Sequence, residues 1–152
     1  MRMRHIIALA TAVPALVIAV VMAPTPAFAD TRFHADSGDN CRYGSTDGVL
    51  TARLADVVAT GTLTDRPTPT DPVACRDDGF FSVATFTAFA GNRLIDQQAV
   101  RANNSTVRVG LVLGSPTAVA RIDRVVIQVC RHPLVTLPPS YCGRAVEYRA
   151  PF

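Results

Sequence analysis

Histidine is the side chain whose pKa lies closest to neutral pH, and two of the three histidines, His34 and His132, lie beyond the first 29 residues. Asp36 stands two residues after His34, and Glu147 is the only glutamate, so a carboxylate could orient an imidazole that acts as a general base. The chain has no G-x-S-x-G and no H-E-x-x-H pattern. We therefore predict no catalytic residues, and a small extracellular hydrolase with His34 or His132 as its base is the alternative.

A group of oxygen-bearing side chains follows His34. It consists of Asp36, Asp39, Asn40 and Asp47, and oxygen is the ligand atom that calcium prefers. Their spacing does not match D-x-[DN]-x-[DN]-G, which is the pattern that places such ligands around one ion. The nine glycines are scattered rather than gathered in a phosphate-binding loop. We expect a solvated turn here, no metal site and no cofactor.

Four cysteines, Cys41, Cys75, Cys130 and Cys142, could bind a metal or form disulfides. They lack the close C-x-x-C spacing of zinc sites, and only His132 lies near any of them in the sequence. The N-terminus, described below, indicates that the domain is exported. An even number of cysteines in a small exported domain predicts two disulfides. Three pairings are possible. We favour Cys130 with Cys142 because they bracket a hairpin, and this leaves Cys41 with Cys75.

Residues 131–141, between the last two cysteines, are the most unusual surface segment of the chain. Three prolines, Pro133, Pro138 and Pro139, lie inside a loop that a disulfide would close. Such a loop loses less conformational entropy on binding than a free peptide does, which is typical of a preorganised recognition segment. We predict a partner-binding loop centred on Val135, Thr136, Leu137, Pro138 and Pro139. Its backbone is expected to be extended.

The stretch Thr136-Leu-Pro-Pro139 resembles the Thr/Ser-Ile-Pro-Pro stretch of Bowman–Birk-type inhibitor loops. The resemblance covers these four residues, in a longer loop and without that family's other cysteines. It implies a protease inhibitor that presents residues 131–141 to an apolar-preferring enzyme of the subtilisin or elastase type, since Arg131 lies too close to the disulfide to be the main specificity residue. The alternative is a proline-stiffened connection between two strands.

The N-terminus has the order of segments that is typical of a secretory signal peptide. A positive segment, Met1–Arg4, precedes an apolar run from Ile6 to Ala23 and a small-residue site that ends at Ala29. We predict that residues 1–29 are removed and that the mature chain is secreted. No second apolar segment follows, so no membrane attachment of the mature chain is expected.

The mature chain, residues 30–152, has the length of one domain with a single hydrophobic core. Its formal net charge falls from +3 to +1 because Arg2 and Arg4 leave with the signal peptide. A basic surface for nucleic acid is therefore not indicated, and we expect a protein or cell-wall partner. All fifteen basic residues are arginine, which indicates a bacterial source with GC-rich codons.

Apolar residues recur with period 2 over most of the mature chain, which predicts strands. Residues 30–47 are rich in turn formers and are expected to form an irregular arm. Gly48–Thr64 fits a helix or two strands, and we favour strands at Val49–Leu54 and Val57–Leu63 because Val and Thr are frequent there. Further strands are expected at Phe80–Phe89, Leu94–Arg101, Thr106–Leu113, Ile122–Cys130 and Cys142–Tyr148.

Two hairpins organise these strands. Phe80–Phe89 and Leu94–Arg101 should pair through the turn Gly91-Asn92, and the last two strands should pair around the disulfide loop. One helical turn could follow Ser115. We expect the core to be formed by Phe80, Phe81, Val83, Phe86, Phe89, Val107, Val109, Leu111, Val125, Ile127, Val129 and Val146.

The sequence therefore predicts an all-β protein, a two-sheet antiparallel β-sandwich of seven or eight strands that is immunoglobulin-like in broad architecture. Export, two disulfides, near-neutral charge and the lack of a catalytic pattern together favour a non-enzymatic binding module. A protease inhibitor and a small hydrolase are the two alternatives.

Overall fold

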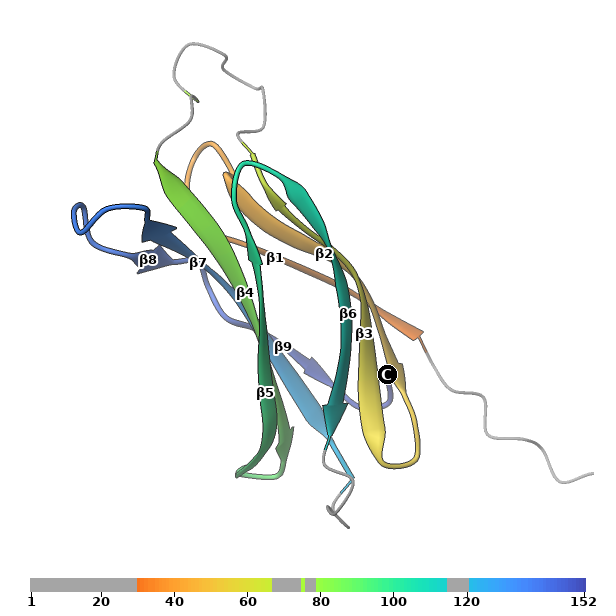
Figure 1. Ribbon diagram of the computed structural model, residues 1–152. Coiled ribbons are helices and arrows are strands. Elements are labelled where there is room, and N and C mark those ends of the chain that lie inside the picture. Colours follow the sequence, from red (N-terminus) through yellow and green to blue (C-terminus); the bar gives the residue numbers. More distant parts are fainter. Residues whose placement is uncertain (1–29, 67–74, 76–78, 115–120) are drawn as a thin grey trace, which may run out of the picture.

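Buried and exposed side chains alternate along most of the strands, as expected where one face of a sheet packs on a core and the other faces water. The computed structural model describes residues 30–66, 75, 79–114 and 121–152 (Figure 1). The predicted signal peptide and most of the helical turn expected after Ser115 lie outside these residues. None of the described residues forms a helix long and apolar enough to cross a bilayer.

The described residues form nine strands, one or two more than expected. Their bounds are β1 (Asp30–Asp36), β2 (Gly44–Ala52), β3 (Asp56–Asp65), β4 (Phe80–Ala90), β5 (Arg93–Ala102), β6 (Thr106–Gly114), β7 (Arg124–Pro133), β8 (Tyr141–Cys142) and β9 (Val146–Arg149). Gly48–Thr64 belongs to two strands rather than a helix, and both predicted hairpins are present.

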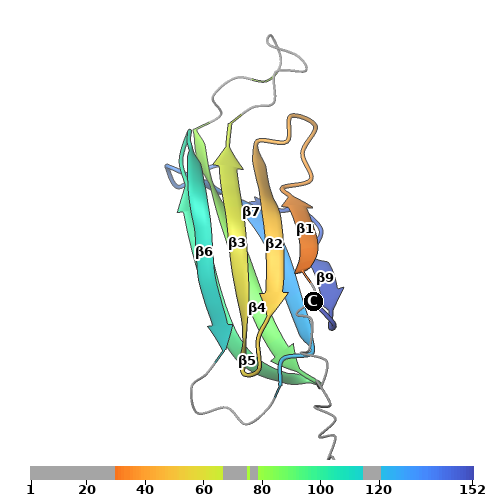
Figure 2. The ribbon, with the colours of Figure 1, turned by 90° about the vertical axis from the view of Figure 1, so that its right-hand side faces the viewer.

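The strands form two antiparallel sheets packed face to face, so the two-sheet prediction is confirmed. One sheet has the order β1-β2-β3-β6, and the other has β5-β4-β7 with both β8 and β9 pairing to β7. Figure 2 shows the two layers, with the first sheet in front of β4 and β7. The chain crosses between the layers after β3, after β5 and after β6.

The core lies between the layers and receives side chains from both sheets. Phe33 of β1 meets Phe86 of β4 edge to face, with 5.6 Å between the ring centroids and 81° between the planes. The buried apolar cluster consists of Phe33, Ala35, Leu50, Val57, Ala59, Leu63, Ala84, Phe86, Ala88, Ala102, Val109, Leu113, Ile122, Val125, Ile127, Val129 and Phe152.

The prediction of an irregular arm over residues 30–47 was correct only for residues 37–43, and it was wrong for the residues that form β1 and the start of β2. β1 pairs with β2 along its whole length, from Asp30 opposite Thr51 to Asp36 opposite Ser45. Phe33 and Ala35 point inward and His34 points outward, so period-2 alternation is present. The pattern was missed because one inward position is a small alanine and the turn formers after Asp36 dominate the composition.

The core prediction was correct for one face of β4 and wrong for the other. Phe80 and Phe86 are buried, whereas Phe81, Val83 and Phe89 lie on the outer face and are half-buried. Arginines cover the outer rings: the Arg101 guanidinium carbon lies 3.7 Å from the centre of the Phe81 ring, and that of Arg124 lies 4.3 Å from Phe89. Aromatic rings on both faces of β4 therefore do not require a second layer of core.

Two glycines stand opposite each other in the first sheet, where the neighbouring strands leave no room for a side chain. Gly48 of β2 pairs with Gly61 of β3, and on its other side Gly48 pairs with Phe33 of β1. A β-carbon on Gly48 would lie 2.6 Å from the tip of the Phe33 ring and 2.8 Å from the α-carbon of Gly61. Only glycine fits here, and the Phe33 ring covers the space that its missing side chain leaves.

Within the described residues, the outer edges of β1 and β6 pair with no strand of the second sheet. Side chains from β9 and β5 instead bond backbone groups at these two edges. At β1, the Tyr148 hydroxyl from β9 accepts a hydrogen bond from the backbone N–H of His34 and donates one to its carbonyl oxygen, both at 2.8 Å. At β6, Gln98 donates to the carbonyl of Val112 at 2.7 Å, and a carboxylate oxygen of Asp96 accepts from the N–H of Gly114 at 3.1 Å. These bonds satisfy backbone groups on both edge strands of the first sheet.

Candidate functional site

The loop predicted to bind a partner is held at its base by a disulfide. Cys130 of β7 and Cys142 of β8 are direct cross-strand neighbours and form one disulfide, and Cys41 and Cys75 form the other, so both favoured pairings are present. Two disulfides are compatible with an extracellular location. In Figure 1 the loop projects beyond β8, away from the body of the sandwich.

Hydrogen bonds add to the disulfide at the base of this loop. The backbone N–H of Leu134 donates to the carbonyl of Gly79 at 2.9 Å, and the ring nitrogen Nδ1 of His132 lies 2.9 Å from the Ser140 hydroxyl. The Tyr141 ring packs against Phe80 with 5.7 Å between centroids. The two ends of the loop are therefore fixed relative to β4 and β7.

The tip of the loop is apolar and open to solvent. Leu134 is 49% exposed, Val135 is 70% exposed and Leu137 is 75% exposed. Six large apolar side chains are exposed in the described part of the chain, and three of them lie within residues 134–137. Thr136, Pro138 and Pro139 of the predicted site are also exposed. We call residues 134–140 the apolar loop.

The backbone of the apolar loop is not extended, contrary to expectation. The chain bends at Leu134–Thr136 and again at Pro138, and the peptide bond between Leu137 and Pro138 is cis. β7 ends at Pro133, so residues 134–140 belong to no strand. The prolines thus stiffen a folded-back tip rather than a straight segment.

Arg131 is the first residue of the disulfide loop, and its side chain is held inside the protein. Its guanidinium forms an ion pair with Asp65 of β3, and it also donates to the Ser82 hydroxyl at 2.8 Å. Ser82 donates to the same carboxylate at 2.8 Å, and the backbone N–H of Asn104 donates to its other oxygen at 2.8 Å. The pair is almost completely buried, with 1% and 2% of the two side chains exposed.

No motif or spacing in the sequence indicates this buried ion pair. Arg131 follows a cysteine at the end of an alternating strand, and its inward direction is fixed by the parity of Val125, Ile127 and Val129. That parity is the signal that could have located Arg131. Its partner Asp65 is 66 positions away, so the pairing depends on the crossing between the sheets.

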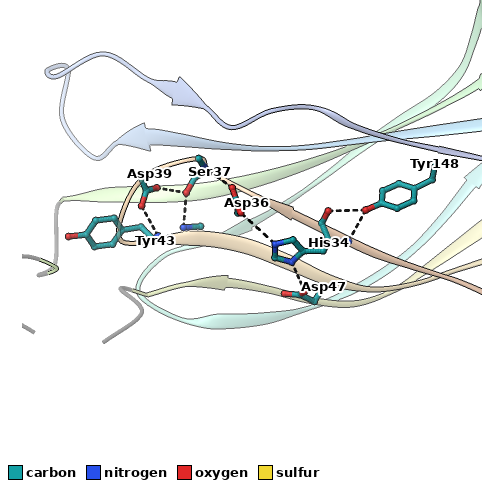
Figure 3. A network of polar contacts seen from close by, with 9 residues as sticks. His34, Asp36, Ser37, Asp39, Tyr43, Asp47 and Tyr148 are labelled. Carbon is teal, nitrogen blue, oxygen red and sulfur yellow. Dashed lines mark hydrogen bonds and ion pairs between the residues drawn. The ribbon is translucent and has the colours of Figure 1, made fainter. Parts of the chain in front are cut away.

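A second polar arrangement surrounds His34 on the outer surface of β1 and β2 (Figure 3). Its Nδ1 lies 2.6 Å from a carboxylate oxygen of Asp47, the residue opposite it on β2, and its Nε2 lies 3.5 Å from Asp36. The hydrogen bond to Asp47 raises the pKa of His34 above 6.5, with a further contribution from Asp36, while partial burial opposes the change.

His34 and Asp47 border an open depression of about 600 Å³ between β1, β2 and β9. It is lined by Arg32, Phe33, His34, Asp47, Gly48, Val49 and Tyr148. Its polar groups are a cationic side chain, the imidazole with its carboxylate, and the phenol. The phenol oxygen already bonds both backbone groups of His34, so it contributes structure to the wall of the depression.

We predict that the His34 contacts stabilise the fold more below neutral pH than above it. Because the pKa of His34 is raised on folding, its stabilisation is fully present below about 6.5 and is lost as pH rises through the folded value. The difference in urea midpoint between the wild type and His34→Gln should therefore shrink as pH rises above 6.5. Asp47→Asn removes the main cause and should reduce this dependence. An NMR-titrated pKa of 6.5 or below for His34 would contradict the prediction.

No family model matches the chain, and comparisons with curated proteins and with solved structures found no match either. The chemistry of the site is therefore judged from its geometry.

Among the described residues, neither His34 nor His132 contacts both partners that a serine-type hydrolase needs. The imidazole of His34 contacts two carboxylates, but the nearby Tyr148 hydroxyl bonds the His34 backbone instead of the ring. The His132 imidazole contacts the Ser140 hydroxyl and stacks on Phe81, and no carboxylate of the described residues contacts it. The geometry thus gives each histidine half of a catalytic arrangement.

Two of the four oxygen-bearing residues after His34, Asp36 and Asp39, bond groups within the turn between β1 and β2, whereas Asp47 lies in β2 and contacts His34. One carboxylate oxygen of Asp39 accepts the backbone N–H groups of Cys41 and Tyr43, both at 3.1 Å, and its other oxygen accepts the Ser37 hydroxyl. Asp36 accepts the N–H of Gly38 at 2.9 Å. In the described residues, no three acidic, histidine or cysteine side chains gather as metal ligands would.

Proposed function

We propose that this protein is a secreted, non-enzymatic binding module that holds a protein or cell-wall partner through the apolar loop. The observation that supports the proposal is the concentration of exposed aliphatic side chains at Leu134, Val135 and Leu137 on a base closed by a disulfide. Removal of residues 1–29, bacterial origin and a broad immunoglobulin-like relationship are part of the same proposal, on the sequence patterns alone.

The energetics of the loop favour binding. Each aliphatic side chain that moves from water into an apolar cleft contributes roughly 1.5–3 kcal/mol. A free peptide would lose much of this gain in ordering its backbone, whereas the disulfide, the prolines and the bonds at the base order this loop beforehand. Clusters of exposed apolar side chains are uncommon on proteins that act alone.

A protease inhibitor is the second candidate, because the apolar loop both projects from the body and is closed at its base. Its bent backbone argues against insertion as an added strand, so this function would need the tip itself to enter the enzyme cleft. A small hydrolase remains the least supported alternative, because each histidine has half of the required partners. Nucleic acid and membrane binding are not part of the proposal.

The test is a charge placed at the tip, with a matched charge elsewhere. A partner is first captured from culture supernatant or cell-wall extract. Leu137→Asp should lower the affinity for this partner by about tenfold or more, because the aspartate must be desolvated in an apolar cleft. Leu54→Asp is the control, since Leu54 is 87% exposed in the turn between β2 and β3, at the other end of the sandwich (Figure 1). Titration calorimetry on the purified pair gives both affinities.

Four results distinguish the functions. Loss of affinity with Leu137→Asp and not with Leu54→Asp supports the binding module. Equal affinity of both variants and the wild type refutes the role of the apolar loop. Inhibition of elastase or subtilisin that Leu137→Asp removes would identify the partner as a protease, whereas hydrolysis of a substrate panel would overturn the non-enzymatic assignment.

A further inference from the structure

The two disulfides have different surroundings. The side chains of Cys130 and Cys142 point to the outer face of the second sheet, where Cys142 is exposed and Cys130 is half-buried. Cys75 of the other disulfide is 8% exposed, and its partner Cys41 is half-buried. A thiolate must reach a sulfur atom in order to break a disulfide. The Cys130–Cys142 bond is therefore the more accessible of the two.

The strand that carries Cys142 is short. β8 contains two residues, and its pairing with β7 covers two positions, Cys130 with Cys142 and Arg131 with Tyr141. The next part of the chain is attached independently. Gly143 donates its N–H to the Val129 carbonyl at 2.9 Å and accepts from the Gln128 side chain at 3.0 Å.

The rest of the second sheet does not need the disulfide. β9 pairs with β7 at four positions, and the inward side chains of β7 remain in the core. Arg131 stays tied to Asp65 and Ser82. His132 and Pro133 also stay paired with β4. Opening the disulfide should therefore release a limited segment, residues 134–142, and leave the sandwich folded.

We infer that Cys130–Cys142 is a redox switch that sets whether the apolar loop is ordered for binding. This inference rests on the proposed function of the loop. The reductant would be a dithiol, either a small molecule or a protein with two neighbouring thiols, outside the cell.

The chemical step is an ordinary thiol–disulfide exchange. A thiolate of the dithiol attacks the sulfur of Cys142, the bond between the two cysteine sulfurs breaks, and Cys130 leaves as a thiolate that takes up a proton. The second thiolate of the reductant then attacks the mixed disulfide and releases Cys142. The dithiol loses two electrons and becomes a disulfide, and the protein ends with two thiols.

The first experiment uses the wild-type protein and dithiothreitol, without any partner. Samples taken during a reductant titration are alkylated, and peptide mass spectrometry gives the extent of reduction of each cysteine pair. We expect Cys130 and Cys142 to be alkylated at least about tenfold faster than Cys41 and Cys75 under native conditions, because the first pair is the more accessible of the two. Equal rates, or faster reduction of Cys41 and Cys75, would overturn the inference.

The second readout is proteolysis of the loop. After selective reduction and alkylation, thermolysin should cut between residues 133 and 141 about 30-fold faster than in the oxidised protein, which is the lower end of the effect of one disulfide on an opening equilibrium. An unchanged cleavage rate would also overturn the switch. The double variant Cys130→Ala/Cys142→Ala should cleave at the reduced rate without any reductant, and Cys41→Ala/Cys75→Ala should leave cleavage of this loop as in the oxidised protein.

Failure of the switch and failure of the binding module give different results. Reduction order and cleavage rate are measured without a partner, so they decide the switch alone. If Leu137→Asp leaves partner affinity unchanged, the binding role fails whatever the redox result. If both hold, selective reduction should lower partner affinity by about tenfold, because the partner must then order the loop itself.

Discussion

Replacing Arg131 by methionine is expected to lower the free energy of unfolding by about 3–5 kcal/mol, the cost of breaking a buried ion pair from one side. The change leaves the Asp65 carboxylate with the Ser82 hydroxyl and the Asn104 N–H but without its cation, at 2% exposure. Methionine has a similar length and fills most of the space, so the loss is mainly electrostatic. Urea denaturation followed by circular dichroism measures the effect.

Two variants control this result. Arg101→Met removes an arginine that covers an aromatic ring on the outer surface, and it should cost about 1 kcal/mol or less. Arg131→Met combined with Asp65→Leu removes both charges, and it should be clearly more stable than the sum of the two single changes predicts. A cost below about 1 kcal/mol for Arg131→Met alone would show that the pair is not buried as described.

A methyl group on Gly48 is expected to destabilise the protein by about 1–3 kcal/mol, the usual cost of overpacking. The new β-carbon would meet the carbonyl oxygen of Thr60 and the tip of the Phe33 ring, and the α-carbon of Gly61 leaves no room to retreat. Because Phe33 packs on Phe86, its displacement would be felt in both sheets. The midpoint of thermal or urea unfolding measures the change.

Gly110→Ala is the matched control for Gly48→Ala. Gly110 also lies inside a strand of the same sheet, but a β-carbon there meets no atom within 4 Å. Alanine in place of an unrestrained strand glycine should be neutral or slightly stabilising. If Gly48→Ala were as stable as Gly110→Ala, Phe33 would not lie as close to Gly48 as described.

Local patterns in the sequence predicted most of the fold. Alternation located both hairpins, and the bracketing of a hairpin by Cys130 and Cys142 predicted one disulfide and, by elimination, the other. β1 was missed because its inward residues include a small alanine and it precedes a run of turn formers. The number of strands was underestimated for the same reason, and because the last strand is interrupted between β8 and β9.

The site was less predictable, since its determinants are far apart in the chain. Composition located the loop, but the exposure of Leu134, Val135 and Leu137 and the bends between them depend on how β7 ends. The burial of Arg131 depends on Asp65 from the other sheet, and the surroundings of His34 depend on Asp47 and on Tyr148, 114 residues later. Period and spacing carry no information about such long-range pairs.

The side-chain bonds at the edges of β1 and β6 affect whether the protein aggregates at high concentration. Bare strand edges let copies of a chain stack into ladders that grow into fibrils. Here the Tyr148 hydroxyl occupies one backbone rung of β1, and Gln98 and Asp96 occupy rungs of β6. A neighbouring copy must therefore displace those side chains before it can add a strand.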